Sequence, residues 1–166
     1  MSQSKFLDKY AVPNEHFGVQ DNPFAFKMTH PIKELLDIAI KHPDPIIRSN
    51  AAKNAHASKE HLDTALSDPN RNVRLSAIEN RKATPDHITK ALQDSNDFVR
   101  ATAIGHPNST KEILDAGLKD LSYIVRAAVV SHSNATPDHL GWGLNDKSEF
   151  VRSSAKIHPN YAKWFS

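Results

Sequence analysis

Apolar, small and polar positions recur along this chain with a period of 26 residues. The most regular position holds an arginine, which follows a β-branched apolar residue and precedes, by three positions, a small or apolar one. These arginines are Arg48, Arg74, Arg100, Arg126 and Arg152. Five arginines in one register indicate internal repetition, so we expect repeated units over residues 33–162.

Each unit is predicted to contain two short helices. The first helix begins after a serine or threonine, whose hydroxyl accepts a hydrogen bond from a free N–H group of the first turn. These predicted caps are Ser58, Thr84, Thr110 and Thr136. An acidic residue follows in the first turn, where it meets the positive end of the helix dipole. Leucine and isoleucine four positions apart then form the buried face, with an alanine or glycine between them that lets a neighbouring helix approach closely.

The second helix carries the repeated arginine. It is predicted to begin after Asp44, Asn70, Asn96, Ser122 and Ser148. It ends near the Asn or His six positions after the arginine, where Pro107 and Pro159 prevent further helix. A unit of two short helices cannot bury its apolar stripe alone. We therefore expect an all-α protein, a right-handed α-solenoid of five 26-residue two-helix repeats with terminal caps.

The two ends of the chain depart from the repeat. Residues 1–32 lack the pattern and are rich in aromatic side chains, namely Phe6, Tyr10, Phe17, Phe24 and Phe26. Residues 163–166 include Trp164 and Phe165, where another first helix would begin. We predict an N-terminal cap over 1–32 and a C-terminal cap over 163–166, because the end units of a solenoid need a covered outer face.

The segment 94–118, DSNDFVRATAIGHPNSTKEILDAGL, resembles the leucine-rich repeat variant family, whose units read approximately D-x-x-x-x-V-R-x-x-x-A-x-N-P-x-x-[ST]-x-x-x-L. It is more distantly similar to HEAT-type repeats. The resemblance implies an α-helical superhelix that binds proteins, and it also brings in HEAT-like DNA glycosylases, which bind DNA. The unit here is slightly longer than is usual in the family, and the cysteine-rich segment of some members is missing.

Composition and charge exclude several classes of site. The 166 residues contain no cysteine, which excludes disulfides, thiolate zinc sites and cysteine nucleophiles. The net charge is +2, so neither a strongly basic nor a strongly acidic surface is expected, although ten histidines add charge in mild acid. Because no apolar stretch is long enough for a signal peptide or a bilayer span, we expect a cytoplasmic protein without a membrane partner.

The repeated arginines are predicted to have acidic partners. Each arginine lies in the first turn of its helix, where the dipole disfavours a cation. Acidic residues six positions earlier lie at the end of the preceding helix, where an anion is disfavoured, and they are Asp68, Asp94, Asp120 and Asp146. We therefore predict a structural Asp–Arg ladder within and between units, with a phosphate-binding stripe as the alternative. The exceptional arginine is Arg48, because His42 stands at the position of the acid.

Six of the histidines form two rows. One row lies in the first helices (His61, His87 and His139) and the other at the junctions between units (His106, His132 and His158). Ligands of one metal ion must converge within about 4 Å, whereas packed helices lie about 8–10 Å apart, so we expect no metal and no cofactor. The junction row shares its position with Asn54 and Asn80, which predicts a common hydrogen-bonding or helix-ending role. A pH-dependent surface charge is the other interpretation.

The sequence favours binding over catalysis. No nucleophile with a base and no glycine-rich phosphate loop is present, so we expect no enzymatic activity. The favoured hypothesis is a protein-interaction scaffold that uses a row two positions before the arginines, Ile46, Phe98, Ile124 and Phe150. This row lies on the far side of the second helix from the buried stripe, although it could instead pack against neighbouring units. The sequence does not predict the oligomeric state.

The alternative hypothesis is a HEAT-like protein that binds nucleic acid with a curved basic face. The basic residues on or after the second helices are Lys53, Arg71, Arg81, Lys82 and Lys156. A glycosylase-like activity would also need an acid and aromatic walls in one cleft. The candidates for such a cleft are Trp142, Trp164 and either Asp138 or Asp146.

Overall fold

The computed structural model describes residues 32–166, and apart from Ile32 the predicted N-terminal cap lies outside the described residues. This described part consists of eleven α-helices and contains no strand. The helices are α2 (Ile32–Ala39), α3 (Pro45–Lys53), α4 (Lys59–Ala65), α5 (Arg71–Ile78), α6 (Pro85–Ala91), α7 (Asp97–Ile104), α8 (Lys111–Gly117), α9 (Tyr123–Ser131), α10 (Pro137–Leu144), α11 (Glu149–Lys156) and α12 (Tyr161–Phe165).

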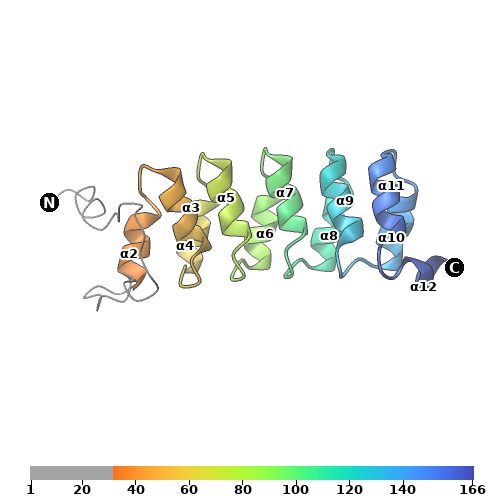
Figure 1. Cartoon of the computed structure of the whole chain (residues 1–166), viewed down its shortest axis with the longest axis horizontal. Helices are drawn as coiled ribbons and strands as arrows, with labels where there is room; N and C mark the ends of the chain where they lie inside the picture. Colours follow the sequence, from red (N-terminus) through yellow and green to blue (C-terminus); the bar gives the residue numbers. More distant parts are fainter. Residues whose placement is uncertain (1–31) are drawn as a thin grey trace, which may run out of the picture.

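The helices form a row in which each packs on its neighbours in sequence (Figure 1). Helices α3, α5, α7, α9 and α11 stand side by side, and each also packs on the next member of this set. Helices α4, α6, α8 and α10 lie behind them in the view of Figure 1. Every helix therefore buries its apolar face against elements that are close in the sequence.

Side-chain caps set the starts of most helices. Thr84 accepts a hydrogen bond from the backbone N–H of His87 at the start of α6, and Asn70 accepts one from Asn72 at the start of α5. Equivalent bonds start α3, α4, α7, α8, α9 and α10. The predicted cap Ser148 precedes α11 with extended backbone, but its side chain makes no capping bond.

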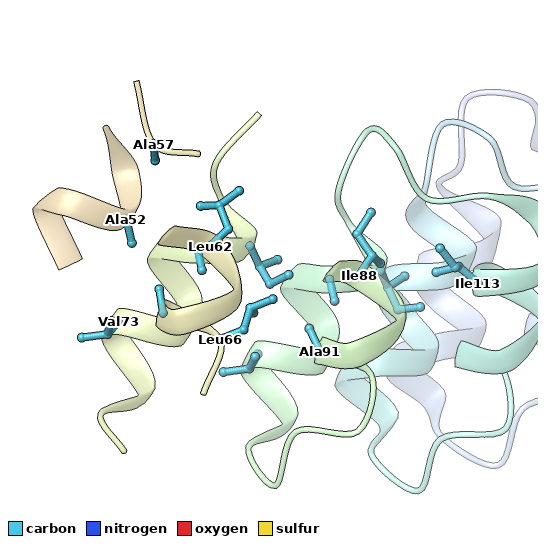
Figure 2. Packing of buried hydrophobic residues seen from close by; sticks show 14 of the residues in the cluster. Ala52, Ala57, Leu62, Leu66, Val73, Ile88, Ala91 and Ile113 are labelled. Atoms are coloured by element: carbon cyan, nitrogen blue, oxygen red, sulfur yellow. The ribbon is translucent and has the colours of Figure 1, made fainter. Parts of the chain in front are cut away.

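The core runs along the row between the two sets of helices (Figure 2). One fully buried leucine or isoleucine comes from each of α4, α6, α8 and α10, namely Leu62, Ile88, Leu114 and Leu140, and α2 contributes the buried Leu36. These side chains meet β-branched and alanine side chains of the second helices in two clusters, and Leu118 packs against both. The shared contact makes the core continuous along the row.

Helix α12 packs against the last of these clusters. Tyr161 and Trp164 contact the core, and the Trp164 ring stacks on His158 with their centroids 5.6 Å apart. Within residues 32–166, no helix is long and apolar enough to cross a membrane.

Candidate functional site

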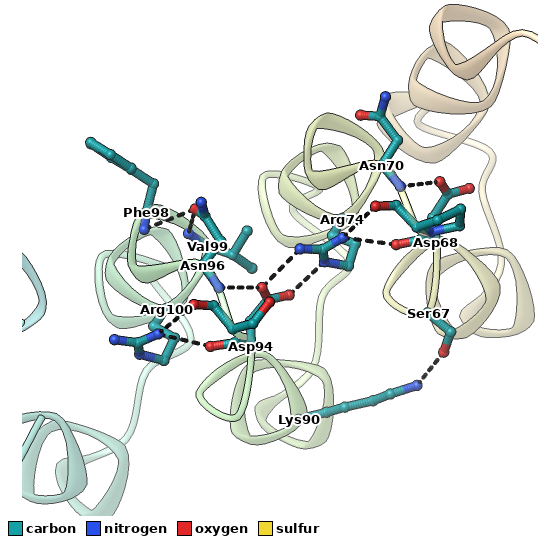
Figure 3. A network of polar contacts seen from close by, with 12 residues as sticks. Ser67, Asp68, Asn70, Arg74, Lys90, Asp94, Asn96, Phe98, Val99 and Arg100 are labelled. Carbon is teal, nitrogen blue, oxygen red and sulfur yellow. Dashed lines mark hydrogen bonds and ion pairs between the residues drawn. The ribbon is translucent and has the colours of Figure 1, made fainter. Parts of the chain in front are cut away.

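The repeated arginines bind acidic side chains of the following unit (Figure 3). Arg74 donates from Nε to Asp94 Oδ2 at 2.6 Å and from Nη2 to Asp94 Oδ1 at 2.9 Å. The same two-bond geometry joins Arg48 to Asp68, Arg100 to Asp120 and Arg126 to Asp146. Planar pairing of this kind is the strong form of an ion pair. In all four pairs the aspartate lies 20 residues after the arginine, so each pair joins two consecutive units.

Each arginine also donates hydrogen bonds to backbone carbonyls of the turn before its own helix. Nη1 of Arg74 donates to the carbonyl oxygens of Asp68 and Pro69, at 2.9 and 3.1 Å. The aspartate six positions earlier therefore contacts the arginine through its backbone carbonyl, while its side chain binds the arginine of the preceding unit. This corrects the predicted side-chain pairing within a unit. Arg48, Arg74, Arg100 and Arg126 therefore each join the turn before their own helix to the next unit.

The exceptional arginine is at the C-terminal end of the row and not at Arg48. Arg48 has the full set of contacts, because His42 supplies only a backbone carbonyl at 2.8 Å and Asp68 supplies the carboxylate. Arg152 makes the backbone contacts to Asp146 and Lys147, but no carboxylate of residues 32–166 lies within ion-pair distance of it. The prediction of Arg48 as the exception is wrong because the acid that matters follows the arginine.

The pair between Arg126 and Asp146 is the most deeply buried of the four. The two side chains are 4% and 1% exposed. Hydrogen bonds from the Arg126 guanidinium hold the pKa of Asp146 below its ordinary value, although burial acts in the opposite direction. Both carboxylate oxygens of Asp146 are used, since Oδ1 also accepts the backbone N–H of Ser148.

A second ladder joins the first helices, and sequence reasoning did not find it. Nε2 of the buried His61 lies 2.8 Å from Asp37 Oδ1, and Nε2 of His139 lies 2.9 Å from Asp115 Oδ1. His87 lies 3.3 Å from Asp63 Oδ1, but its Nε2 has no hydrogen-bonded partner. The Nδ1 atoms accept the N–H of the helix caps, a role that glutamate usually fills.

The sequence does contain a signal for this second ladder. Each aspartate also pairs with a lysine four positions earlier, as Lys59 does with Asp63. In the one internal unit that lacks the lysine, Pro85 stands in its place, Thr89 replaces the aspartate, and Ile113 replaces the histidine of the next unit. The three replacements occur together, which is the pattern expected of side chains that contact one another.

The junction histidines form a third ladder. Nε2 of His106, His132 and His158 lies 3.2–3.3 Å from the carbonyl oxygen of the residue 26 positions earlier. Nδ1 accepts the backbone N–H two residues later, which leaves Nε2 as the ring nitrogen that faces the carbonyl oxygen as a donor. Asn80 makes the equivalent bond from Nδ2 to the carbonyl oxygen of Asn54 at 3.1 Å, which is the shared hydrogen-bonding role that the sequence predicts, and it also donates to Ala52.

Within this third ladder, His106 predicts a loss of stability in mild acid. Burial lowers the pKa of His106 from its ordinary value of 6.5, although the bond to the Asn80 carbonyl opposes the shift. Between the folded and unfolded pKa values, the unfolded chain binds more protons. The free energy of unfolding is therefore highest above the unfolded pKa and decreases as the pH falls through 6.5 towards the folded value.

The test is urea denaturation from about pH 7.5 to about pH 5.5, where histidine titrates. We expect His106→Asn to reduce the slope of unfolding free energy against pH, because Asn80 makes the same bond to Asn54 with an amide, which does not titrate. An unchanged slope in this variant would show that His106 does not contribute.

Three of the four residues of the predicted apolar row are exposed. Ile46, Phe98 and Phe150 are 68%, 54% and 58% exposed, and Ile124 is half-buried. Phe98 points away from the helices in Figure 3. Tyr123, one position before Ile124, is also exposed and meets Phe150 edge to face with ring centroids 5.7 Å apart. We call Phe98, Tyr123, Ile124 and Phe150 the apolar strip.

A shallow hollow lies between the last two units, at the turns that precede α9 and α11. Its volume is about 510 Å³. Leu121, which is 91% exposed, and the half-exposed Trp142 line it together with the paired side chains of Arg126 and Asp146. These exposed apolar side chains were not among the predicted partner-binding residues, because a single leucine in a turn carries no periodic signal.

The predicted basic residues do not form one row. Lys53 forms an ion pair with Glu79 at 2.9 Å. Both side chains line a small surface depression, which Arg81 also lines. Lys82 lies close by and contacts the Ala57 carbonyl. Arg71 starts α5 at its opposite end, and Lys156 ends α11 in the last unit. All five are exposed, but they are separated along and across the row, and one is neutralised by an acid.

The residues proposed for a glycosylase-like cleft are also separated. Trp142 and Asp146 share the hollow, but both oxygens of Asp146 are hydrogen-bonded. Trp164 stacks on His158, and Asp138 is exposed in the first turn of α10. Across residues 32–166, no three His, Asp or Glu side chains gather in an arrangement that could hold a metal ion.

The chain was also compared with protein-family models and with curated proteins. No protein-family model matches the chain, and no curated protein matches it.

Proposed function

We propose that this chain is a non-enzymatic interaction protein that binds a protein partner. In this proposal it is a right-handed α-solenoid of five 26-residue units, similar to leucine-rich repeat variant and HEAT-like proteins. The exposure of the apolar strip is the observation that carries the proposal. Its aromatic members lie on consecutive second helices and do not contribute to the buried core.

The strip has the composition of a protein-binding surface. Aromatic side chains bury about 150–250 Å² each and supply much of the binding energy at interfaces. Single exposed apolar residues are common, but a contiguous row of them marks a surface that is covered in a complex. Tyr123 and Phe150 contact each other across two units, so they present one continuous surface.

The ladders support a scaffold role for the polar residues. The paired arginine and aspartate side chains join consecutive units. The arrangement holds the second helices in register and so places the strip on a rigid support. Exposed residues on such a support lose little conformational entropy on binding.

We expect the double substitution Phe98→Ser and Phe150→Ser to abolish partner binding without unfolding the protein. Both side chains are mostly exposed, so each change should alter the free energy of unfolding by about 0.5 kcal/mol or less. The measurement is affinity capture from the native host with quantitative mass spectrometry, which compares the wild type with the double variant.

The matched control is Ile157→Ser. Ile157 is 81% exposed but lies after α11, at the opposite end of that helix from Phe150. Proteins that bind the strip should be lost with the double variant and retained with the control. Proteins captured equally by all three would argue against the strip, and capture abolished by nuclease would favour the nucleic-acid alternative.

A further inference from the structure

All five ladder arginines are positioned in the same way by backbone carbonyls. Arg152 donates from Nη1 to the carbonyl oxygens of Asp146 and Lys147 at 2.8 and 3.0 Å. Arg126 makes the corresponding bonds to Asp120 and Leu121, both at 2.9 Å. The guanidinium of Arg152 is therefore oriented before any ligand arrives, which reduces the entropy lost on binding.

The four internal arginines show what this orientation binds. Their Nε and Nη2 atoms hold an aspartate carboxylate at 2.6–3.0 Å. The described residues offer no carboxylate to the same two donors of Arg152. Helix α12 follows the C-terminal end of α11, whereas the Arg152 guanidinium contacts the turn before the N-terminal end of that helix.

We propose that Arg152 is a binding site for a carboxylate side chain, aspartate or glutamate, of a partner polypeptide. The bound carboxylate takes the place that Asp146 occupies on Arg126. The nearby acid Glu149, three positions before Arg152 and one turn away on α11, favours a singly charged group over a phosphate. A second copy stacked head to tail does not supply the group, because His42 stands at the acid's position in the first unit.

The test uses the intact protein and the Nε–H resonances of its arginines in ¹H–¹⁵N spectra. Sodium acetate is the first probe. We expect the Arg152 resonance to shift and saturate, whereas the Arg126 resonance stays in place because Asp146 already holds it. Arg71 is the internal control, since it is an exposed arginine at the first position of α5. An equal, unsaturable shift at Arg71 and Arg152 would mean that no site exists.

The second probe is a peptide with the sequence of residues 118–125, LKDLSYIV, whose aspartate is the one that Arg100 binds. Fluorescence anisotropy of the labelled peptide measures its affinity for each variant. We expect Asn in place of that aspartate to weaken binding by about tenfold or more, and Arg152→Lys to do the same, because lysine lacks the planar fork. Equal binding of both peptides, or tighter binding of inorganic phosphate, would overturn the proposal. These readouts follow Arg152 alone, so they stand or fall independently of the apolar strip.

Discussion

Replacement of Arg126 by methionine is expected to lower the free energy of unfolding by about 3–5 kcal/mol, the usual cost of removing one member of a buried ion pair. The methionine fills much of the space of the arginine stem but leaves Asp146 buried without its counter-charge. It also leaves the carbonyl oxygens of Asp120 and Leu121 without a donor. Chemical denaturation with global fitting of the midpoint and slope measures the loss.

The matched control is the same substitution at Arg152. Arg152→Met removes equivalent carbonyl contacts but strands no aspartate of the described residues. We expect a cost of about 1 kcal/mol, typical of hydrogen bonds at a partly exposed site. The difference between the two variants isolates the contribution of the carboxylate. Equal losses would show that the backbone contacts, and not the ion pairs, stabilise the junctions.

Replacement of Gly117 by alanine is expected to destabilise the protein by about 1–3 kcal/mol, the usual cost of overpacking a core. A Cβ atom at this position would lie 2.5 Å from Ile104 Cδ1 and 2.7 Å from Val129 Cγ2, and both side chains are completely buried. In the preceding unit the same two positions hold Ala91 and Ala103. Gly117 therefore makes room for Val129, which stands where the preceding unit has the smaller Ala103.

The compensation can be tested directly by thermal denaturation. Gly117→Ala combined with Val129→Ala recreates the pair of the preceding unit, so we expect the double variant to lose less stability than the sum of the single variants. Gly105→Ala is the control, because its Cβ would meet only backbone oxygens at 3.6 and 3.7 Å. We expect it to be neutral or to stabilise by about 0.4–1 kcal/mol. Additive losses would refute the compensation.

The helices and their limits were predictable from the sequence. Caps such as Thr84 and Asn70 act on backbone groups two or three positions away, and the apolar stripes use spacings of three and four residues. These interactions are local, so the residues that make them are visible together in the sequence. The 26-residue spacing of the arginines was also visible in the sequence. An all-helical fold follows from these signals, because units of this kind bury their apolar faces only against each other.

The tertiary structure alone decided which side chains meet between units. An arginine contacts an aspartate 20 residues later, and a buried histidine contacts an aspartate 24 residues earlier. Neither spacing follows from helix periodicity, because both depend on how one unit is rotated against the next. The local dipole argument therefore assigned Arg74 to the side chain of Asp68, whose backbone carbonyl it binds instead. Rotation between units also leaves Phe98 and Phe150 exposed, and no pattern within one unit determines that rotation. Arg152 has no carboxylate of the described residues because it lies in the last unit of the described row.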